Sequence, residues 1–270
     1  MTGGPGAGKG TQCTLLTQAY GADVRGEDGN EPAVANARDS SRPSSFGVAH
    51  ISVGAVLRRA INSIHDQSPS SSSSNFTLSS ADRDLILSTL ARGGILPGRL
   101  TVQLVRQELA RLVHEQATIN PTKRLCCVID GFPRTMDNVN EFERQCGRID
   151  SVLLLDCDPE QMIARLGQRG RSDDKVDVIQ RRIEGFNKET MPVVEWFKGE
   201  VQAYEANGDR SSVLPTASSS SPANVNTPFI PHFYVIDGRP SIETVWKEVR
   251  QVFKQFALAR MAIDIDQQAR

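Results

Sequence analysis

The chain has 270 residues, a length that allows one large domain or two small ones. Apolar residues make up 39% of the sequence and charged residues 23%, which is ordinary for a soluble globular protein. The net charge of −1 gives no electrostatic reason to expect nucleic acid or an anionic membrane as a partner.

The cysteines and the apolar runs predict the compartment. The five cysteines lack the paired spacing of a metal site, which predicts reduced and mostly buried thiols: Cys13, Cys126, Cys127, Cys146 and Cys157. No apolar run approaches the ~18–20 residues that span a bilayer. Only Met1 and Thr2 precede the first motif, so no signal peptide is expected. We therefore predict a cytoplasmic protein, with the nucleus as an additional compartment.

The first motif in the chain is the run 3–11, Gly-Gly-Pro-Gly-Ala-Gly-Lys-Gly-Thr. A loop that wraps a phosphate needs positive φ and space free of Cβ atoms, and its N–H groups form an anion nest. Lys9 would add a positive charge, and the following helix would present its N-terminal end to the phosphates. Gly10 separates this lysine from the hydroxyl of Thr11, which is a departure from the general motif. The run predicts a phosphate-binding loop rather than a flexible glycine-rich tail.

A buried strand should lead into such a loop, but only Met1 and Thr2 stand there. Two residues cannot supply a strand of about five or six. We therefore expect either a sheet that lacks its first strand or a true chain that starts further upstream, and we favour the second.

The rest of the chain alternates helical and strand patterns. Helices are predicted over 11–20, 52–64, 80–92, 101–115, 159–169, 174–188, 191–206 and 241–260. A short strand is predicted over 48–51, and apolar runs predict buried strands over 125–130, 151–156 and 233–237. Polar segments over 21–47, 66–79 and 207–231 are interpreted as surface insertions of low complexity. The alternation predicts one α/β domain, a parallel sheet with helices on both faces.

Three arginine-bearing segments follow the glycine loop. Arg58 lies in a helix after a strand, and Asp130-Gly-Phe-Pro-Arg134 directly follows a buried strand. A third segment carries Arg165, Arg169, Arg171, Arg181 and Arg182. Each segment alone is explained as a solvated face or a surface ion pair. Together with a phosphate loop, they predict cations that converge on a transferring phosphoryl group, at the strand ends where Asp130 falls.

These motifs together resemble those of the nucleoside monophosphate kinases, the family of adenylate kinases and UMP-CMP kinases. The matching segments are 3–13, Ser-x-Gly-x-x-Leu-Arg at 52–58, Ile-Leu-Pro at 95–97, Asp-Gly-Phe-Pro-Arg at 130–134, Arg-Ser-Asp-Asp at 171–174 and Arg-Arg-Ile at 181–183. The resemblance covers nearly all of the chain outside the three insertions. It implies a single kinase domain over 1–270 of the P-loop NTPase type, with an acceptor-binding subdomain over 53–97 and a very short lid over 167–174. It also implies a monomer.

The resemblance assigns roles to the matched residues. ATP would be held by Gly6, Ala7, Gly8, Lys9, Gly10, Thr11 and Arg169. The acceptor nucleotide would be bound by Ser52, Arg58, Gly94, Ile95, Leu96, Gly131, Arg134, Asn138, Arg171 and Arg182. Lys9, Arg134, Arg171 and Arg182 would be catalytic, and Asp130 would hold Mg²⁺ through water. No side-chain base is demanded, because the acceptor phosphate is itself the nucleophile.

Asn138 bears on the choice of acceptor. In the family, the position four residues after the arginine of Asp-Gly-Phe-Pro-Arg contacts the acceptor base. It is typically Gln in adenylate kinases and Asn in UMP-CMP kinases. Asn138 therefore indicates UMP or CMP, although asparagine is also common in the first turn of a helix. Two alternatives stay open: an adenylate kinase that uses AMP, and a truncated nucleotide-binding protein that does not catalyse.

Two further departures concern the acceptor site and the lid. Ala55 stands where the family carries Asp or Glu, so one polar contact near the acceptor is lost. Only Gly170 separates Arg169 from Arg171, and so short a lid would exclude water less well and allow more ATP hydrolysis.

Overall fold

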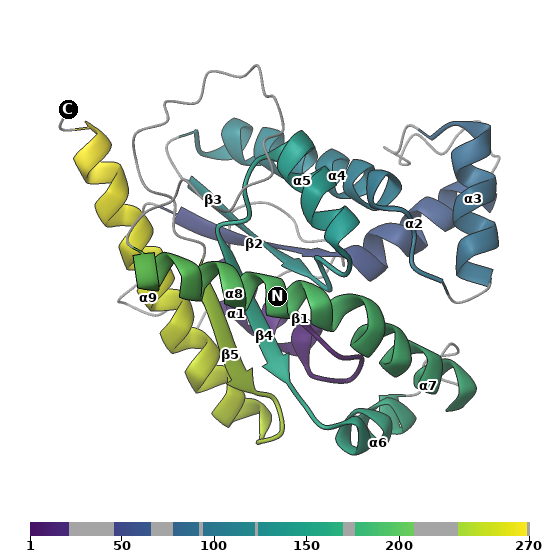
Figure 1. Cartoon of the computed structure of the whole chain (residues 1–270). Coiled ribbons are helices and arrows are strands. Elements are labelled where there is room, and N and C mark those ends of the chain that lie inside the picture. The colour runs from purple at the N-terminus through teal and green to yellow at the C-terminus, as the bar shows by residue number, and fades with distance from the viewer. Residues whose placement is uncertain are drawn as a thin grey trace.

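Figure 1 shows the computed structural model of the chain. The structure describes residues 1–21, 46–65, 78–91, 94–121, 124–169, 176–207 and 232–268. The three predicted insertions and the predicted lid lie outside these ranges, apart from their end residues. Among the described helices, none is both long enough and apolar enough to cross a bilayer.

The described part of the chain forms a parallel sheet. Its strands are β1 (Thr2–Gly3), β2 (Phe46–Ser52), β3 (Arg124–Asp130), β4 (Ser151–Asp156) and β5 (His232–Asp237). β2 pairs with β3, whereas β1 and β5 flank β4. The Met1 amino group donates to the Ile129 carbonyl at 2.8 Å, and the Gly131 N–H donates to the Met1 carbonyl at 3.0 Å. The strand pairings form two halves, β2-β3 and β1-β4-β5. The two bonds of Met1 place β1 beside β3 and join the halves, so the strands lie in the order β2-β3-β1-β4-β5.

The expectation that the first strand is absent needs correction. Thr2 and Gly3 form a two-residue strand at the centre of the sheet, where Thr2 lies opposite Leu154 and Gly3 opposite Leu155. Two residues suffice here because they are held on both sides, by β4 and by the carbonyl and N–H groups of the β3 end. The short strand leads straight into the glycine loop.

Helices connect the strands and cover both faces of the sheet. They are α1 (Lys9–Tyr20), α2 (Val53–His65), α3 (Ser80–Ala91), α4 (Gly98–Ile119), α5 (Met136–Cys146), α6 (Pro159–Arg169), α7 (Val176–Gly185), α8 (Met191–Asn207) and α9 (Ile242–Gln268). A single π-helical turn, Phe186–Thr190, joins α7 to α8, so the two helices predicted over 174–188 and 191–206 continue into each other. The alternation of strand and helix confirms the predicted α/β class.

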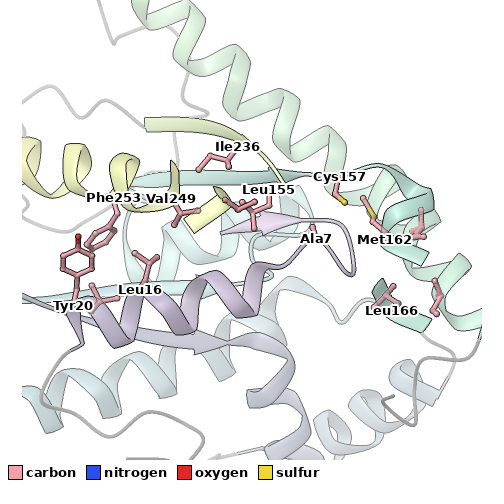
Figure 2. Close-up of a cluster of buried hydrophobic side chains, with 14 residues drawn as sticks. Ala7, Leu16, Tyr20, Leu155, Cys157, Met162, Leu166, Ile236, Val249 and Phe253 are labelled. Atoms are coloured by element: carbon pink, nitrogen blue, oxygen red, sulfur yellow. The ribbon is translucent and has the colours of Figure 1, made fainter. Parts of the chain in front are cut away.

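The two faces of the sheet bury different residues because side chains alternate along each strand. On one face, α1 and α9 pack over the sheet, and Figure 2 shows Leu16 of α1 and Val249 of α9 on the side of Leu155 of β4. On the other face, α4 covers Ala49 and Ile51 of β2. The central strands are therefore enclosed from both sides, which explains their apolar sequences.

Helix α5 was not predicted from the sequence. Thr135 caps it by accepting a hydrogen bond from the Asn138 N–H at 3.1 Å. Val139 and Phe142, three residues apart, are the apolar residues that it buries. So sparse an apolar pattern is too weak to predict a helix by itself. Packing against α4 supplies the rest of the stability of α5.

The sheet register gathers the predicted site at one edge. Ser52 lies opposite Asp130, and Asp156 lies opposite Asp237, so these polar residues share the carboxyl ends of the strands. In Figure 1, α2 and α3 lie on one side of the loop that follows β1, and α6 lies on the other. The loop is thus flanked by the two regions expected to hold the acceptor and the lid.

Candidate active site

The glycine loop has the backbone geometry that a phosphate nest requires. Gly6 has φ +83°, and a Cβ at this position would lie 2.8 Å from the Met162 carbonyl oxygen. No other residue fits there without moving the backbone of α6. Gly8, with φ +92°, is the N-cap residue directly before α1, so the positive end of that helix faces the loop. The segment therefore has the backbone shape expected of a phosphate-binding loop.

Lys9 folds back over this loop. Its Nζ donates hydrogen bonds to the carbonyl oxygens of Gly3 at 2.8 Å and Gly4 at 2.7 Å. A phosphate bound in the loop would supply a charged acceptor in addition to these neutral ones. Gly10 and Thr11 lie exposed in the first turn of α1, beside the loop.

Asp130 ends β3 close to Lys9 and faces His50 of β2. The His50 Nε2 lies 3.7 Å from the Asp130 Oδ2, which is longer than a hydrogen bond, so the pair is held by charge. Burial favours the neutral acid, but His50 and Lys9 outweigh it and lower the pKa of Asp130. Asp130 is therefore an ionised carboxylate at neutral pH.

The Asp130 carboxylate suits a water-mediated Mg²⁺ site. Its Oδ1 is buried and accepts no hydrogen bond from any described residue. Within the described ranges, no group of three His, Cys, Asp or Glu side chains could hold a metal ion. Mg²⁺ keeps most of its waters and binds through one or two carboxylates together with substrate phosphates. One ionised carboxylate beside a phosphate loop matches that preference.

Arg134 follows Asp130 after a tight turn. Many protein atoms surround it, but part of its surface stays exposed to solvent. Its Nε donates to the Gly131 carbonyl at 2.9 Å, and its own carbonyl accepts from the Thr190 hydroxyl at 3.1 Å. Burial lowers the pKa of Arg134; the negative charge of Asp130 opposes this shift, and the positive charge of Arg182 on α7 adds to it. Two arginines from separate elements thus lie near enough to act on each other and on Asp130.

The acceptor side is less enclosed. The Ser52 hydroxyl accepts a hydrogen bond from the Ala55 N–H at 3.3 Å and so caps the start of α2. Arg58, about one turn after Ala55, is exposed. Its Nη1 atom would lie 3.4 Å from a Cβ atom placed on Gly54. The guanidinium therefore folds back toward the start of α2, next to the strand ends.

Asn138 lies at the start of α5 and is only 1% exposed. Its Oδ1 accepts a hydrogen bond from the Arg134 N–H at 3.1 Å, which fixes the orientation of the amide. Its Nδ2 is buried and has no hydrogen-bond partner among the described residues. A buried donor without a partner is costly, so this group is suited to donate to a ligand.

The segment 94–97 lies between α3 and α4. The Gly94 N–H donates to the Thr89 carbonyl at 3.0 Å, and Leu96 is buried at 4% exposure. Ile95 is half-buried between them. The backbone expected to line the acceptor base is thus anchored at both ends.

The arginine-rich segment does not act as one cluster. Arg165 donates to the carbonyl oxygens of Gly238 at 2.7 Å and Arg239 at 2.9 Å, which ties α6 to the turn after β5. Arg181 donates to the Asp177 carbonyl within its own helix. The side chain of Arg169 and the whole of Arg171 lie outside the described residues, so their predicted roles stay predictions.

Two residues of this site had no role in the sequence analysis. His50 lies inside the predicted strand 48–51 and was given no role, although strand alternation places it on the face of β2 opposite Ile51. Thr190 binds the Arg134 backbone from the π-helical turn, and no local pattern marks such a turn. A prediction that β2 pairs with β3 would have placed His50 close to Asp130.

Comparisons with known proteins agree with this geometry. The family model described as adenylate kinase matches residues 40–202. A UMP-CMP kinase from Prunus armeniaca is 31% identical over 210 residues, which cover 77% of this chain and 69% of that protein. A uridylate kinase from Saccharomyces cerevisiae is 32% identical over 215 residues, covering 78% and 82% of the two chains. The human adenylate kinase isoenzyme 1 is 28% identical over 220 residues, covering 79% and 88%.

The glycine loop, the ionised carboxylate beside it and the neighbouring Arg134 and Arg182 are groups of the kind that phosphoryl transfer requires. The family match and the extent of the curated matches assign the same chemistry. The chain therefore belongs to the adenylate kinase family and is an ATP-dependent nucleoside monophosphate kinase.

Proposed function

We propose that this kinase transfers the γ-phosphoryl group of ATP reversibly to UMP or CMP, with Mg²⁺. The observation that carries the choice of acceptor is the buried Asn138 amide, whose Nδ2 has no partner within the described residues. Relatives named as UMP-CMP kinase and uridylate kinase, at 31% and 32% identity, support the same choice.

The free donor of Asn138 suits either pyrimidine. Uracil and cytosine both present the O2 carbonyl oxygen, which accepts a hydrogen bond. A single N–H donor placed at O2 can therefore serve both bases, provided that its amide does not flip. The bond from the Arg134 N–H to Oδ1 supplies that restraint.

The described residues divide the work of transfer between them. The glycine loop and Lys9 would hold the ATP phosphates, while Arg58 and Arg134 would bind the acceptor phosphate. Arg182, close to Arg134, would stabilise the charge on the phosphoryl group as it moves. Bound Mg²⁺ would neutralise the phosphate oxygens, and Asp130 would orient it through water. The acceptor phosphate attacks without a protein base, so positioning and charge carry the catalysis.

The test is a coupled assay of ADP release with CMP, UMP and AMP as separate acceptors, with the phosphorylated products identified by chromatography. We expect higher kcat/KM for CMP or UMP than for AMP. A preference for AMP would overturn the pyrimidine assignment and leave the family intact.

A pair of arginine variants tests the site itself. Arg134→Ala should lower kcat/KM by about 100-fold or more, because a cation at the transferring group is lost. Arg144→Ala is the matched control, since Arg144 lies exposed on α5 and pairs with Glu141. Equal rates for the two variants would refute the assignment of Arg134.

A further inference from the structure

We propose that Asp137 is a positioning residue for the acceptor base, because it ties the segment 94–97 to the helix that carries Asn138. This inference rests on the proposed function, since it concerns the same acceptor site. Neither the glycine loop nor the arginines at the phosphates take part in it.

The connection is a hydrogen bond between two helix starts. The Gly98 N–H, at the first residue of α4, donates to the Asp137 Oδ2 at 2.5 Å. Pro97 precedes this helix and offers no side-chain cap of its own. Asp137 therefore caps α4 from α5, and its negative charge complements the positive end of that helix.

The contact depends on the glycine. A Cβ at Gly98 would lie 2.7 Å from the Asp137 carbonyl oxygen and 2.5 Å from Oδ2. The backbone of α5 and the start of α4 approach too closely for any other side chain. The segment that ends at Pro97 is thus held directly against the first turn of α5.

The same segment is also tied to α3. Arg99, the next residue of α4, forms an ion pair with Asp82 at 2.6 Å, and Asp82 in turn accepts from the Ser79 hydroxyl. At its other end, the Gly94 N–H bonds to the Thr89 carbonyl. The base-lining segment is therefore bound on one side to α3 and on the other to α5 through Asp137.

Asp137 and Asn138 are neighbours with complementary tasks. Asn138 offers its Nδ2 donor to the base edge, and Asp137 sets where the opposing backbone of the segment lies. Without the Asp137 carboxylate, the first N–H of α4 loses its partner and the spacing between the two walls of the base site is no longer defined. The acceptor should then bind less tightly, while the phosphate groups and the transfer step keep their geometry.

The experiment compares Asp137→Ala with the conservative Asp137→Asn, whose amide oxygen can still accept from the Gly98 N–H. We expect the acceptor KM of Asp137→Ala to rise about fivefold, the size expected for one lost helix cap. The ATP KM should stay near the wild-type value, and Asp137→Asn should recover most of the loss. Glu141→Gln is the control on the same helix, since Glu141 binds Arg144 and Gln145.

Direct binding separates this inference from the proposed function. Equilibrium dialysis of CMP, UMP and AMP measures acceptor affinity without any transfer, and a thermal melt reports folding of each variant. If the wild-type protein binds one of these nucleotides and Asp137→Ala binds it equally well, the positioning role of Asp137 is overturned, but the proposed function is not. A rise in the KM of ATP together with that of the acceptor, or no recovery in Asp137→Asn, would also overturn it. A wild-type protein that binds none of the three nucleotides would refute both the proposed function and this inference.

Discussion

Asp130 carries a buried negative charge that groups from separate elements surround. Lys9 approaches from the glycine loop, and His50 from β2. Burial works against the imidazolium, but the facing carboxylate, with Cys13 beside it, raises the pKa of His50 to about 10. His50 is therefore a cation at neutral pH and balances Asp130 in the absence of bound nucleotide.

The pH dependence of stability follows from this pair. A raised pKa means that the stabilisation is complete below about pH 6.5, the unfolded value, and is lost as pH rises toward 10. His50→Gln should thus lower the free energy of unfolding by about 2 kcal/mol at pH 6 and by progressively less above it. Urea unfolding at pH 6, 8 and 10 measures the difference.

A matched variant controls for the loss of a histidine as such. His114 lies exposed on α4, so His114→Gln should change stability little at any of the three pH values. A gap between wild type and His50→Gln that stays constant or widens with pH would contradict the charge pairing.

At the scale of the element, α5 shows how a cap supports a site. Thr135 accepts the Asn138 N–H, so one hydroxyl both starts the helix and holds the residue that is proposed to meet the base. The helix begins right after Arg134, and its first turn also carries Asp137. Three acceptor-side residues are therefore placed by one helix start.

Thr135→Ala should lower the free energy of unfolding by about 1 kcal/mol, because the Asn138 N–H loses its acceptor. Thr135→Ser keeps the hydroxyl and should lose much less. Thr118→Ala serves as the control, since Thr118 bonds to the His114 carbonyl near the end of α4 and caps no helix start. Denaturant unfolding compares the variants, and equal effects of Thr135→Ala and Thr118→Ala would exclude the cap.

The elements also show where sequence patterns are sufficient. Strands such as β4 were predicted with their observed bounds, Ser151–Asp156, because a buried parallel strand is a continuous apolar run. The helix α6 was likewise predicted as observed. Helix α5 was missed because its stability comes from a side-chain cap and from packing on α4 more than from its own periodicity. The π-helical turn was missed for a similar reason, since it depends on how α7 meets α8.

At the scale of the whole molecule, the core joins the two halves of the sheet. Leu155 of β4 is fully buried between β1 and β5 and packs in the cluster under α1 and α9. Tyr20 and Phe253, from these two helices, contact each other with ring centroids 5.1 Å apart. Because β1 has only two residues, the glycine loop that follows it depends on this cluster for its position.

Leu155→Ala should lower the free energy of unfolding by about 2–5 kcal/mol, since it leaves a cavity at the centre of the molecule. Val235→Ala is the control on the neighbouring strand, where the side chain is 56% exposed, and should change stability by about 0.5 kcal/mol or less. Urea unfolding followed by circular dichroism measures both. A small loss for Leu155→Ala would mean that the two sheet halves do not depend on this contact.

The amino-acid sequence by itself determined the class of fold, the phosphate loop and the order of the charged motifs. Those features rest on local chemistry: glycine for positive φ, apolar runs for buried strands, and a lysine or arginine at a fixed spacing. Only the tertiary structure decided that Thr2 and Gly3 form a central strand, that His50 faces Asp130 and that Asp137 caps a different helix. Each of these joins residues far apart in the chain, or depends on which strands are neighbours. Such contacts leave no periodic pattern along the sequence, because distance in space after folding, rather than spacing along the chain, brings the groups together.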